Sequence, residues 1–75
     1  MFEMKMGQLI WKTSVQRVDI VYRDGTFHGG LHCGHTFDVL INGNWMPTRI
    51  EYGADSWYLV GISRDEEILG LTVRN

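Results

Sequence analysis

Four side chains between positions 28 and 35 are of the types that bind zinc. His28, His32, Cys33 and His35 offer imidazole nitrogens and a thiol, and four such ligands would complete a tetrahedron. Their spacing matches no standard zinc pattern, and on a strand the adjacent His32 and Cys33 would point in opposite directions. We therefore predict no metal and no cofactor, and expect a glycine-rich turn with a buried cysteine and exposed histidines.

The same stretch and the acidic residues also raise the question of catalysis. Cys33 beside a histidine could form a thiol nucleophile, but the sequence offers no orienting acid or oxyanion site near it. Carboxylates between residues 38 and 67 could act as an acid/base pair, yet so small a chain leaves little room for a dry pocket. The glycines at 25–34 lack the Gly-Lys-Ser/Thr ending and following helix of a phosphate loop. We predict that the protein is not an enzyme.

Binding is the better use of the remaining candidate residues. Trp45, Arg49 and Tyr58 are of the types most enriched at interface hot spots, because they give large contact areas and a planar donor fork. The same three side chains could stack a base or a nucleotide ring. With Asp38 and Glu51 beside them, they form the predicted binding site. A protein partner is expected first, with a small ligand or nucleic acid as alternatives.

These five residues lie together if residues 36–62 form three antiparallel strands joined by two short turns. Asn-Gly at 42–43 tolerates the positive φ angles of a type I′ turn, which fixes the register of the first hairpin. Residues 53–56 are predicted to form a four-residue loop that sets Tyr52 opposite Trp57.

Because side chains alternate along a strand, this register divides the stretch into two faces. The core face holds Phe37, Val39, Ile41, Met46, Thr48, Ile50, Tyr52, Trp57 and Leu59. The mixed face holds Thr36, Asp38, Leu40, Trp45, Pro47, Arg49, Glu51, Tyr58, Val60 and Ile62. One alternative gives the mixed face no binding role: its arginine pairs with a neighbouring carboxylate, and an N-terminal hairpin covers its aromatic rings.

The rest of the chain also reads as short strands. Residues 7–11 and 17–22 predict an opening hairpin, and the alternation at 69–74 predicts a last strand that closes the sheet. Residues 63–67 form a polar loop with room for one helical turn. Five or six short strands with glycine-rich turns predict an all-β fold, a small antiparallel SH3-like or OB-like barrel, with residues 1–75 as one domain.

Composition narrows the class of protein. The net charge of −2 lacks the basic excess of a nonspecific nucleic-acid binder. The single Cys33 cannot form an internal disulfide, and no apolar run approaches the length of a membrane-spanning helix. The first residues do not resemble a signal peptide. We expect a cytoplasmic protein without a membrane partner, in which an exposed edge strand could pair two copies.

Several segments together resemble a family of small proteins of uncharacterised function. They read Leu-His-Cys-Gly at 31–34, Phe-Asp-Val-Leu-Ile-Asn-Gly-Asn-Trp-Met-Pro-Thr-Arg-Ile-Glu-Tyr at 37–52, Trp-Tyr-Leu-Val-Gly at 57–61 and Leu-Gly-Leu-Thr-Val-Arg at 69–74. One departure is at position 35, which is usually acidic in the pattern and is His35 here. That family occurs in phages, conjugative elements and genomes of low-GC Gram-positive bacteria. The resemblance implies a mobile-element context and brings no known activity.

We therefore expect a non-enzymatic binding module, an accessory protein that binds a host or phage protein. Inhibition of a host defence system would be one form of this function. The alternative is a β-barrel that binds a small ligand, a nucleotide or nucleic acid.

Overall fold

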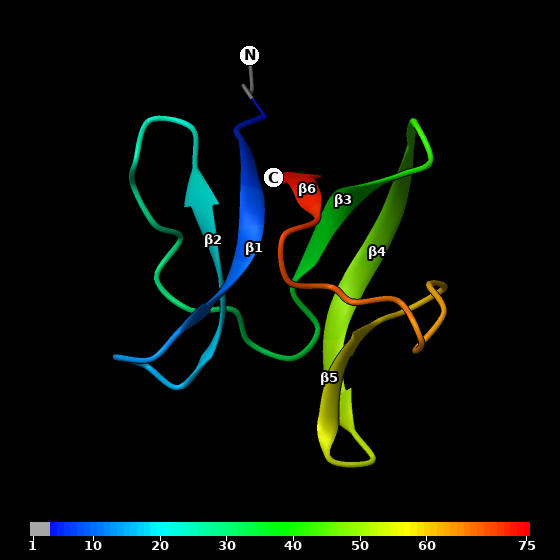
Figure 1. The fold of residues 1–75 in the computed structure, drawn as a ribbon. Helices are drawn as coiled ribbons and strands as arrows, with labels where there is room; N and C mark the ends of the chain where they lie inside the picture. Colours follow the sequence, from blue (N-terminus) through cyan, green and yellow to red (C-terminus); the bar gives the residue numbers. More distant parts are fainter. Residues whose placement is uncertain (1–3) are drawn as a thin grey trace.

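Six antiparallel strands in one sheet make up the regular structure in the computed structural model, which describes residues 4–75 (Figure 1). No helix is present in that part of the chain. The prediction of an all-β antiparallel fold with five or six strands is confirmed, with six strands formed, but the helical turn considered at 65–67 is not formed. The strands are β1 (Met6–Lys12), β2 (Arg17–Tyr22), β3 (Thr36–Ile41), β4 (Asn44–Gly53), β5 (Ser56–Leu59) and β6 (Thr72–Arg74).

The C-terminal strand lies in the middle of the sheet. The strand order is β2-β1-β6-β3-β4-β5, and Val73 of β6 faces Gly7 on one side and Val39 on the other (Figure 1). Within residues 4–75 the strand pairing ends at β2 and β5, so the sheet is open. The last strand therefore bridges the two halves of the molecule, and its predicted role of closing the sheet was wrong.

Turn chemistry sets both C-terminal hairpins. Asn42 and Gly43 have φ angles of 51° and 81°, as a type I′ turn requires, and the predicted register of β3 on β4 is confirmed. Tyr52 faces Trp57 as predicted, but the pairing continues to the next residue pair, so the loop contains only Ala54 and Asp55. The predicted four-residue loop was wrong because these two residues adopt positive φ angles, 51° and 65°, without glycine.

One apolar cluster fills the inner side of the bent sheet. Two of its members, Leu31 and Ile68, come from loops, and Leu31 is completely buried. The other members are Leu9, Val18, Ile20, Tyr22, Phe37, Val39, Ile50, Leu59 and Val73. Most of the predicted core face is buried or packs against this cluster. Tyr52 is the exception, since it is 53% exposed.

The segment at 27–35 crosses from β2 to β4. It first runs along the outer edge of β2, where the backbone N–H of Leu31 donates to the carbonyl of Val18 at 2.8 Å. It then reaches β4, where the N–H of Gly34 donates to the carbonyl of Ile50 at 2.8 Å. This crossing segment covers the β2 edge, so the β5 edge is the uncovered edge of the described sheet.

A buried carboxylate holds the crossing segment in place. Asp19 of β2 is completely buried, although strand alternation places it on the side opposite Val18 and Ile20. Its Oδ1 accepts the backbone N–H groups of Gly29 at 3.0 Å and Gly30 at 2.8 Å. Hydrogen bonds to an ionised acceptor are among the stronger ones in proteins, so Asp19 fixes the path of the segment.

Candidate functional site

The mixed face brings the five predicted binding residues together in two groups. In the first, Arg74 of β6 lies over the Trp45 ring at 4.4 Å, and its Nε donates to Oδ2 of Asp38 at 3.0 Å. Sequence reasoning missed Arg74, because it depends on β6 pairing with β3. Trp45 and Asp38 are both partly buried.

The second group lies on β4 and β5. Arg49 donates from Nε to Oε2 of Glu51 at 3.0 Å, and Tyr58 faces Glu51 across the strand pair. Arg64 covers the Tyr58 ring at 3.9 Å. The arginine of the mixed face thus has a carboxylate partner within the chain.

The N-terminal hairpin does not lie over the mixed face. It continues the same sheet through β6, and Arg49 on the mixed face is exposed. The rings of Trp45 and Tyr58 are nevertheless covered by Arg74 and Arg64, respectively. A partner would have to displace or include these arginines, which makes the mixed face a less open surface than its composition indicates.

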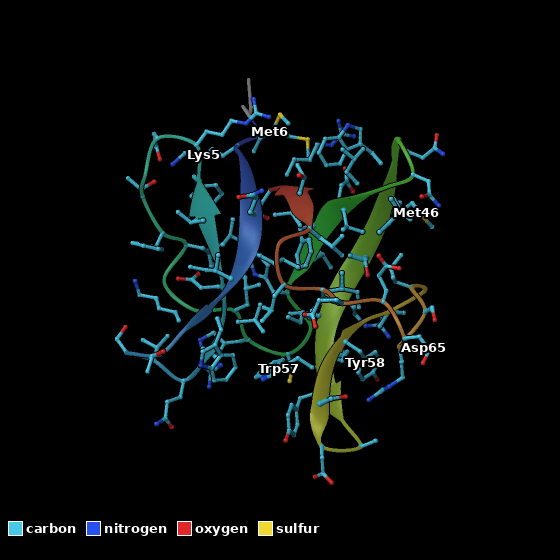
Figure 2. All side chains as sticks on the ribbon, viewed as in Figure 1. Lys5, Met6, Met46, Trp57, Tyr58 and Asp65 are labelled. Carbon is cyan, nitrogen blue, oxygen red and sulfur yellow. The ribbon has the colours of Figure 1, made fainter. Side chains whose placement is uncertain are left out.

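A groove lined by aromatic side chains opens at the end of the core. It has a volume of about 710 Å³ and is lined by Trp11, Gln16, Arg17, His32, Cys33, Tyr52 and Trp57. Figure 2 shows Trp57 on the side of β5 that faces the crossing segment, whereas Tyr58 points to the other side, toward the loop with Asp65. We call this feature the aromatic groove.

Two of the three aromatic rings of the groove, Trp11 and Tyr52, continue rows of core residues, whereas Trp57 packs against the core cluster. On β1, completely buried Leu9 is followed two positions later by Trp11, which is 46% exposed. On β4, completely buried Ile50 is followed in the same way by Tyr52. Strand alternation puts each pair on one face, so these rings leave the core only because the strands extend beyond it.

Tyr52 and Trp57 support one another at the groove wall. Their ring centroids lie 5.2 Å apart in an edge-to-face arrangement, with 65° between the planes. Such pairs are worth roughly 0.5–1.5 kcal/mol beyond their buried area. The Tyr52 ring is therefore held in position while about half of its surface stays in contact with water, and Trp57 beside it is partly buried.

Arg17 and His32 supply the polar wall of the groove. Nη1 of Arg17 donates to the carbonyl of Leu31 at 2.9 Å and lies 3.1 Å from Nδ1 of His32. A guanidinium only donates, so this contact makes Nδ1 the acceptor and leaves the ring proton on Nε2. Gly30 gives the arginine stem its space, because a Cβ there would approach Cδ of Arg17 to 2.9 Å.

The histidines and the cysteine do not converge. His28 contacts the Tyr22 hydroxyl through Nδ1 at 3.1 Å and packs edge-to-face on His35 with centroids 4.5 Å apart. His32 lines the groove and contacts Arg17 instead. Within residues 4–75, no three potential ligands of the His, Cys, Asp or Glu type are grouped to hold a metal. Cys33 is exposed, so the expectation of a buried cysteine was wrong.

The environment of His35 disfavours its protonated form. Burial lowers the pKa of His35, and the nearby His28 lowers it further. Asn75 counteracts these effects only in part, and its amide nitrogen donates to the Tyr22 hydroxyl at 3.2 Å. Nε2 of His35 is buried without a hydrogen-bond partner in the described chain.

Sequence reasoning missed the aromatic groove as a site, although its signal was present. Tyr52 and Trp57 were assigned to the core face, and Trp11 to an apolar strand. Alternation gives the direction of a side chain but not the point at which the core stops. The clue was chemical: three of these positions carry rings with a polar N–H or O–H, which suits a surface that is partly wet.

Comparison with known proteins identifies the family. A family model described as a domain of unknown function, DUF5348, matches residues 7–75. The chain belongs to this family. A crystal structure of a structural-genomics protein from Ruminococcus gnavus is similar, with a TM-score of 0.84 and 45% sequence identity over 95% of this chain and 100% of that one. The comparison with curated proteins found no match.

The fold of this DUF5348 member is thus shared with an experimentally solved protein. At 45% identity, the likeness extends over nearly the whole chain. Neither comparison names a ligand or a reaction. In residues 4–75 there is no helix with the length and apolar character needed to cross a membrane.

Proposed function

We propose that this protein is a non-enzymatic domain that binds an extended segment of a partner protein in the aromatic groove. One observation carries the proposal. Trp11 and Tyr52 extend from the core face past the end of the core, and Trp57 packs against the core cluster beside them. The three rings line a groove in which the first two remain about half exposed. Large aromatic residues such as Trp and Tyr are often the hot spots that supply most of the binding energy of a protein interface.

The shape of the groove favours a segment of a protein over a small ligand. Sites for small molecules typically bury about 70–90% of the ligand surface. Here two walls are side chains that are themselves 46% and 53% exposed, so a bound molecule would stay open to water on one side. An extended chain can pass along such a groove and leave at both ends.

The charge of the groove argues against nucleic acid. Arg17 is the one arginine or lysine among its lining residues, and the whole chain carries a net charge of −2. Backbone phosphates supply most of the affinity for nucleic acid, and each contact needs its own cation. Nucleotide or nucleic-acid binding is therefore the weaker alternative.

An extended, proline-rich segment fits the donor groups of the groove. The indole N–H of Trp11 and Trp57 and the hydroxyl of Tyr52 can donate to backbone carbonyls, which a polyproline II chain leaves free. Aromatic-lined grooves of SH3 domains use this mode of recognition. We propose that the bent sheet works in this SH3-like manner.

Peptide selection on the immobilised domain tests this proposal. Short random peptides displayed on phage should be enriched, and the enriched peptides should bind Trp11→Ala or Tyr52→Ala at least about 10-fold more weakly, as expected for hot-spot residues. Trp45→Ala on the mixed face is the matched control and should bind within about twofold of the unmodified protein. Thermal unfolding confirms that each variant is folded.

The mixed face remains a second candidate surface, because it groups Trp45, Arg49, Tyr58, Glu51 and Asp38. If Trp45→Ala abolished binding of the selected peptides while both groove variants bound normally, the binding site would be the mixed face. That result would contradict the groove.

The family resemblance motivates a narrower form of the proposal. In this form the domain is a cytoplasmic accessory protein of a phage or other mobile element, and its partner is a host or phage protein, including a component of a defence system. Neighbouring genes for defence or counter-defence proteins would support this context. Pairing of two copies along the uncovered β5 edge is a separate proposal, which sedimentation of the purified protein tests.

A further inference from the structure

We propose that Arg17 binds a carboxylate of the segment that occupies the aromatic groove, an inference that rests on the proposed function. The groove then recognises two features at once. The rings of Trp11, Tyr52 and Trp57 contact the apolar part of the segment, and Arg17 selects segments with a carboxylate beside it.

Arg17 is held in a fixed position by its own chain. Its Nη1 group is occupied by the Leu31 carbonyl at 2.9 Å and by Nδ1 of His32 at 3.1 Å. Its stem passes over Gly30, where a side chain would collide with it. An arginine that is already ordered loses little conformational freedom when a ligand binds.

The remaining donors of Arg17 form the edge that suits a carboxylate. Neither Nε nor Nη2 has a hydrogen-bond partner in residues 4–75. These two nitrogens point their N–H groups in parallel from one edge of the guanidinium plane, and a carboxylate can accept both at once. The contacts within the chain thus engage only Nη1, and they leave the Nε and Nη2 groups able to bind a carboxylate together.

Other arginines of the sheet already have partners. Arg49 pairs with Glu51 and Arg74 with Asp38, each with an Nε to oxygen distance of 3.0 Å. By contrast, no carboxylate lies within 4.0 Å of Arg17 in the described chain, and no Asp or Glu lines the groove.

The nearest acid along the strand does not compensate this charge directly. Asp19 is completely buried, and its carboxylate accepts the N–H groups of Gly29 and Gly30. The groove is therefore lined by aromatic rings and by a cation whose Nε and Nη2 groups have no partner in the described chain. Charge complementarity then calls for an anion on the occupant, and a peptide can supply it from an Asp or Glu side chain or from its C-terminus.

A double-mutant cycle between protein and peptide tests the inference. The probes are synthetic copies of the peptides selected on the unmodified domain, made with amidated and with free C-termini. Arg17→Gln should weaken binding by about 10-fold or more, and so should replacing the peptide's Asp or Glu by Asn or Gln. Arg17→Gln tested against the peptide without its Asp or Glu should lose no more affinity than either change alone. Arg17→Lys should restore only part of the affinity, because lysine lacks the fork.

Arg49→Gln is the matched control, because it removes an arginine that already has a carboxylate partner on the mixed face. It should change the affinity by less than about twofold. If the free C-terminus alone restores binding, the carboxylate comes from the chain end, and if amidation has no effect, it comes from an acidic side chain. Both results support a carboxylate at Arg17.

Different results would overturn the role of Arg17 and the binding of a segment in the aromatic groove. Peptides that lose affinity with Trp11→Ala but bind equally well to Arg17→Gln would overturn the role of Arg17 and leave groove binding intact. Selected peptides without any carboxylate would do the same. Failure to select any peptide that depends on Trp11 or Tyr52 would overturn the proposed function itself.

Discussion

The Asp19 side chain holds two segments of the chain together. Its carboxylate lies inside the protein and joins β2 to the crossing segment through Gly29 and Gly30, and it also accepts the N–H of Ile20 at 2.8 Å. The crossing segment in turn holds Leu31 in the core and His32 in the groove wall. Loss of this carboxylate should disturb both stability and the groove.

We predict that Asp19→Ala lowers the free energy of unfolding by about 3–5 kcal/mol, because it removes charge-assisted hydrogen bonds and leaves a buried N–H without an acceptor. A chain of this length has a total free energy of unfolding of about 4–11 kcal/mol, so the variant should lose a large fraction of its stability. Asp19→Asn keeps an acceptor oxygen and should lose only about 1–2 kcal/mol. Urea unfolding measures both, and an Asp19→Ala variant as stable as the unmodified protein would contradict this role.

His35 makes stability depend on pH. Burial and His28 lower the pKa of His35 in the folded state below its ordinary value near 6.5, so the unfolded chain binds more protons in this range. The stability due to neutral His35 is complete above about pH 6.5 and is lost as the pH falls through the folded-state pKa. The melting temperature should therefore drop as the pH falls from about 7 to values below 6.5.

His35→Phe should flatten this pH dependence while keeping a ring beside Phe37, whose centroid lies 6.2 Å from that of His35. His32→Gln removes only the smallest of the effects that lower the pKa of His35, so this variant should retain most of the slope. Thermal unfolding at several pH values measures how the melting temperature of each variant depends on pH. A slope that survives in His35→Phe would show that another group is responsible.

At the level of the elements, the two C-terminal hairpins use the same turn with different residues. Asn42-Gly43 suits positive φ angles, whereas Ala54-Asp55 adopts φ angles of 51° and 65° although the alanine side chain disfavours this conformation. The second turn is therefore held by the strands on either side, and its sequence is not optimal for its shape.

Placing Asn-Gly at 54–55 should raise the free energy of unfolding by about 1 kcal/mol, because it removes the strain of the left-handed conformation. The reciprocal control, Ala-Asp at 42–43, should lower it by a similar amount. Chemical unfolding of both variants compares the two turns directly. If neither exchange changed stability, turn strain would have no part in this fold.

Local signals explain which elements the sequence predicts. The hairpin of β3 and β4 follows from Asn42-Gly43 and alternating side chains, and its register is confirmed. The place of β6 between β1 and β3 depends on residues far apart in the chain, which no local pattern records. The burial of Asp19 has the same origin, since its partners are the backbone N–H groups of the distant glycines at 29–30.

The candidate site also has features that local patterns predict and features that depend on distant parts of the chain. The register correctly placed Trp45, Arg49 and Tyr58 on one face, but Arg74 and Arg64 come from distant segments and cover two of the rings. The aromatic groove needs the crossing segment and both hairpins at once, so its residues could be recognised as aromatic and core-facing but not as one site.

At the scale of the whole molecule, β6 joins the N-terminal hairpin to strands β3, β4 and β5 in one bent sheet whose inner side is core at one end and groove at the other. Trp11 comes from the N-terminal hairpin, and Tyr52 and Trp57 come from the hairpin of β4 and β5. A ligand in the groove would contact both halves of the molecule. Binding should therefore stabilise the folded protein as a unit and raise its melting temperature.

The three tryptophans allow a direct test of where a ligand binds. Trp11 and Trp57 line the groove and Trp45 lies on the mixed face, and each gives one indole N–H signal in a heteronuclear NMR spectrum. Titration with a selected peptide should shift the signals of Trp11 and Trp57 and leave that of Trp45 unchanged. A shift confined to Trp45, or no shift in any indole signal at saturating peptide, would contradict binding in the aromatic groove.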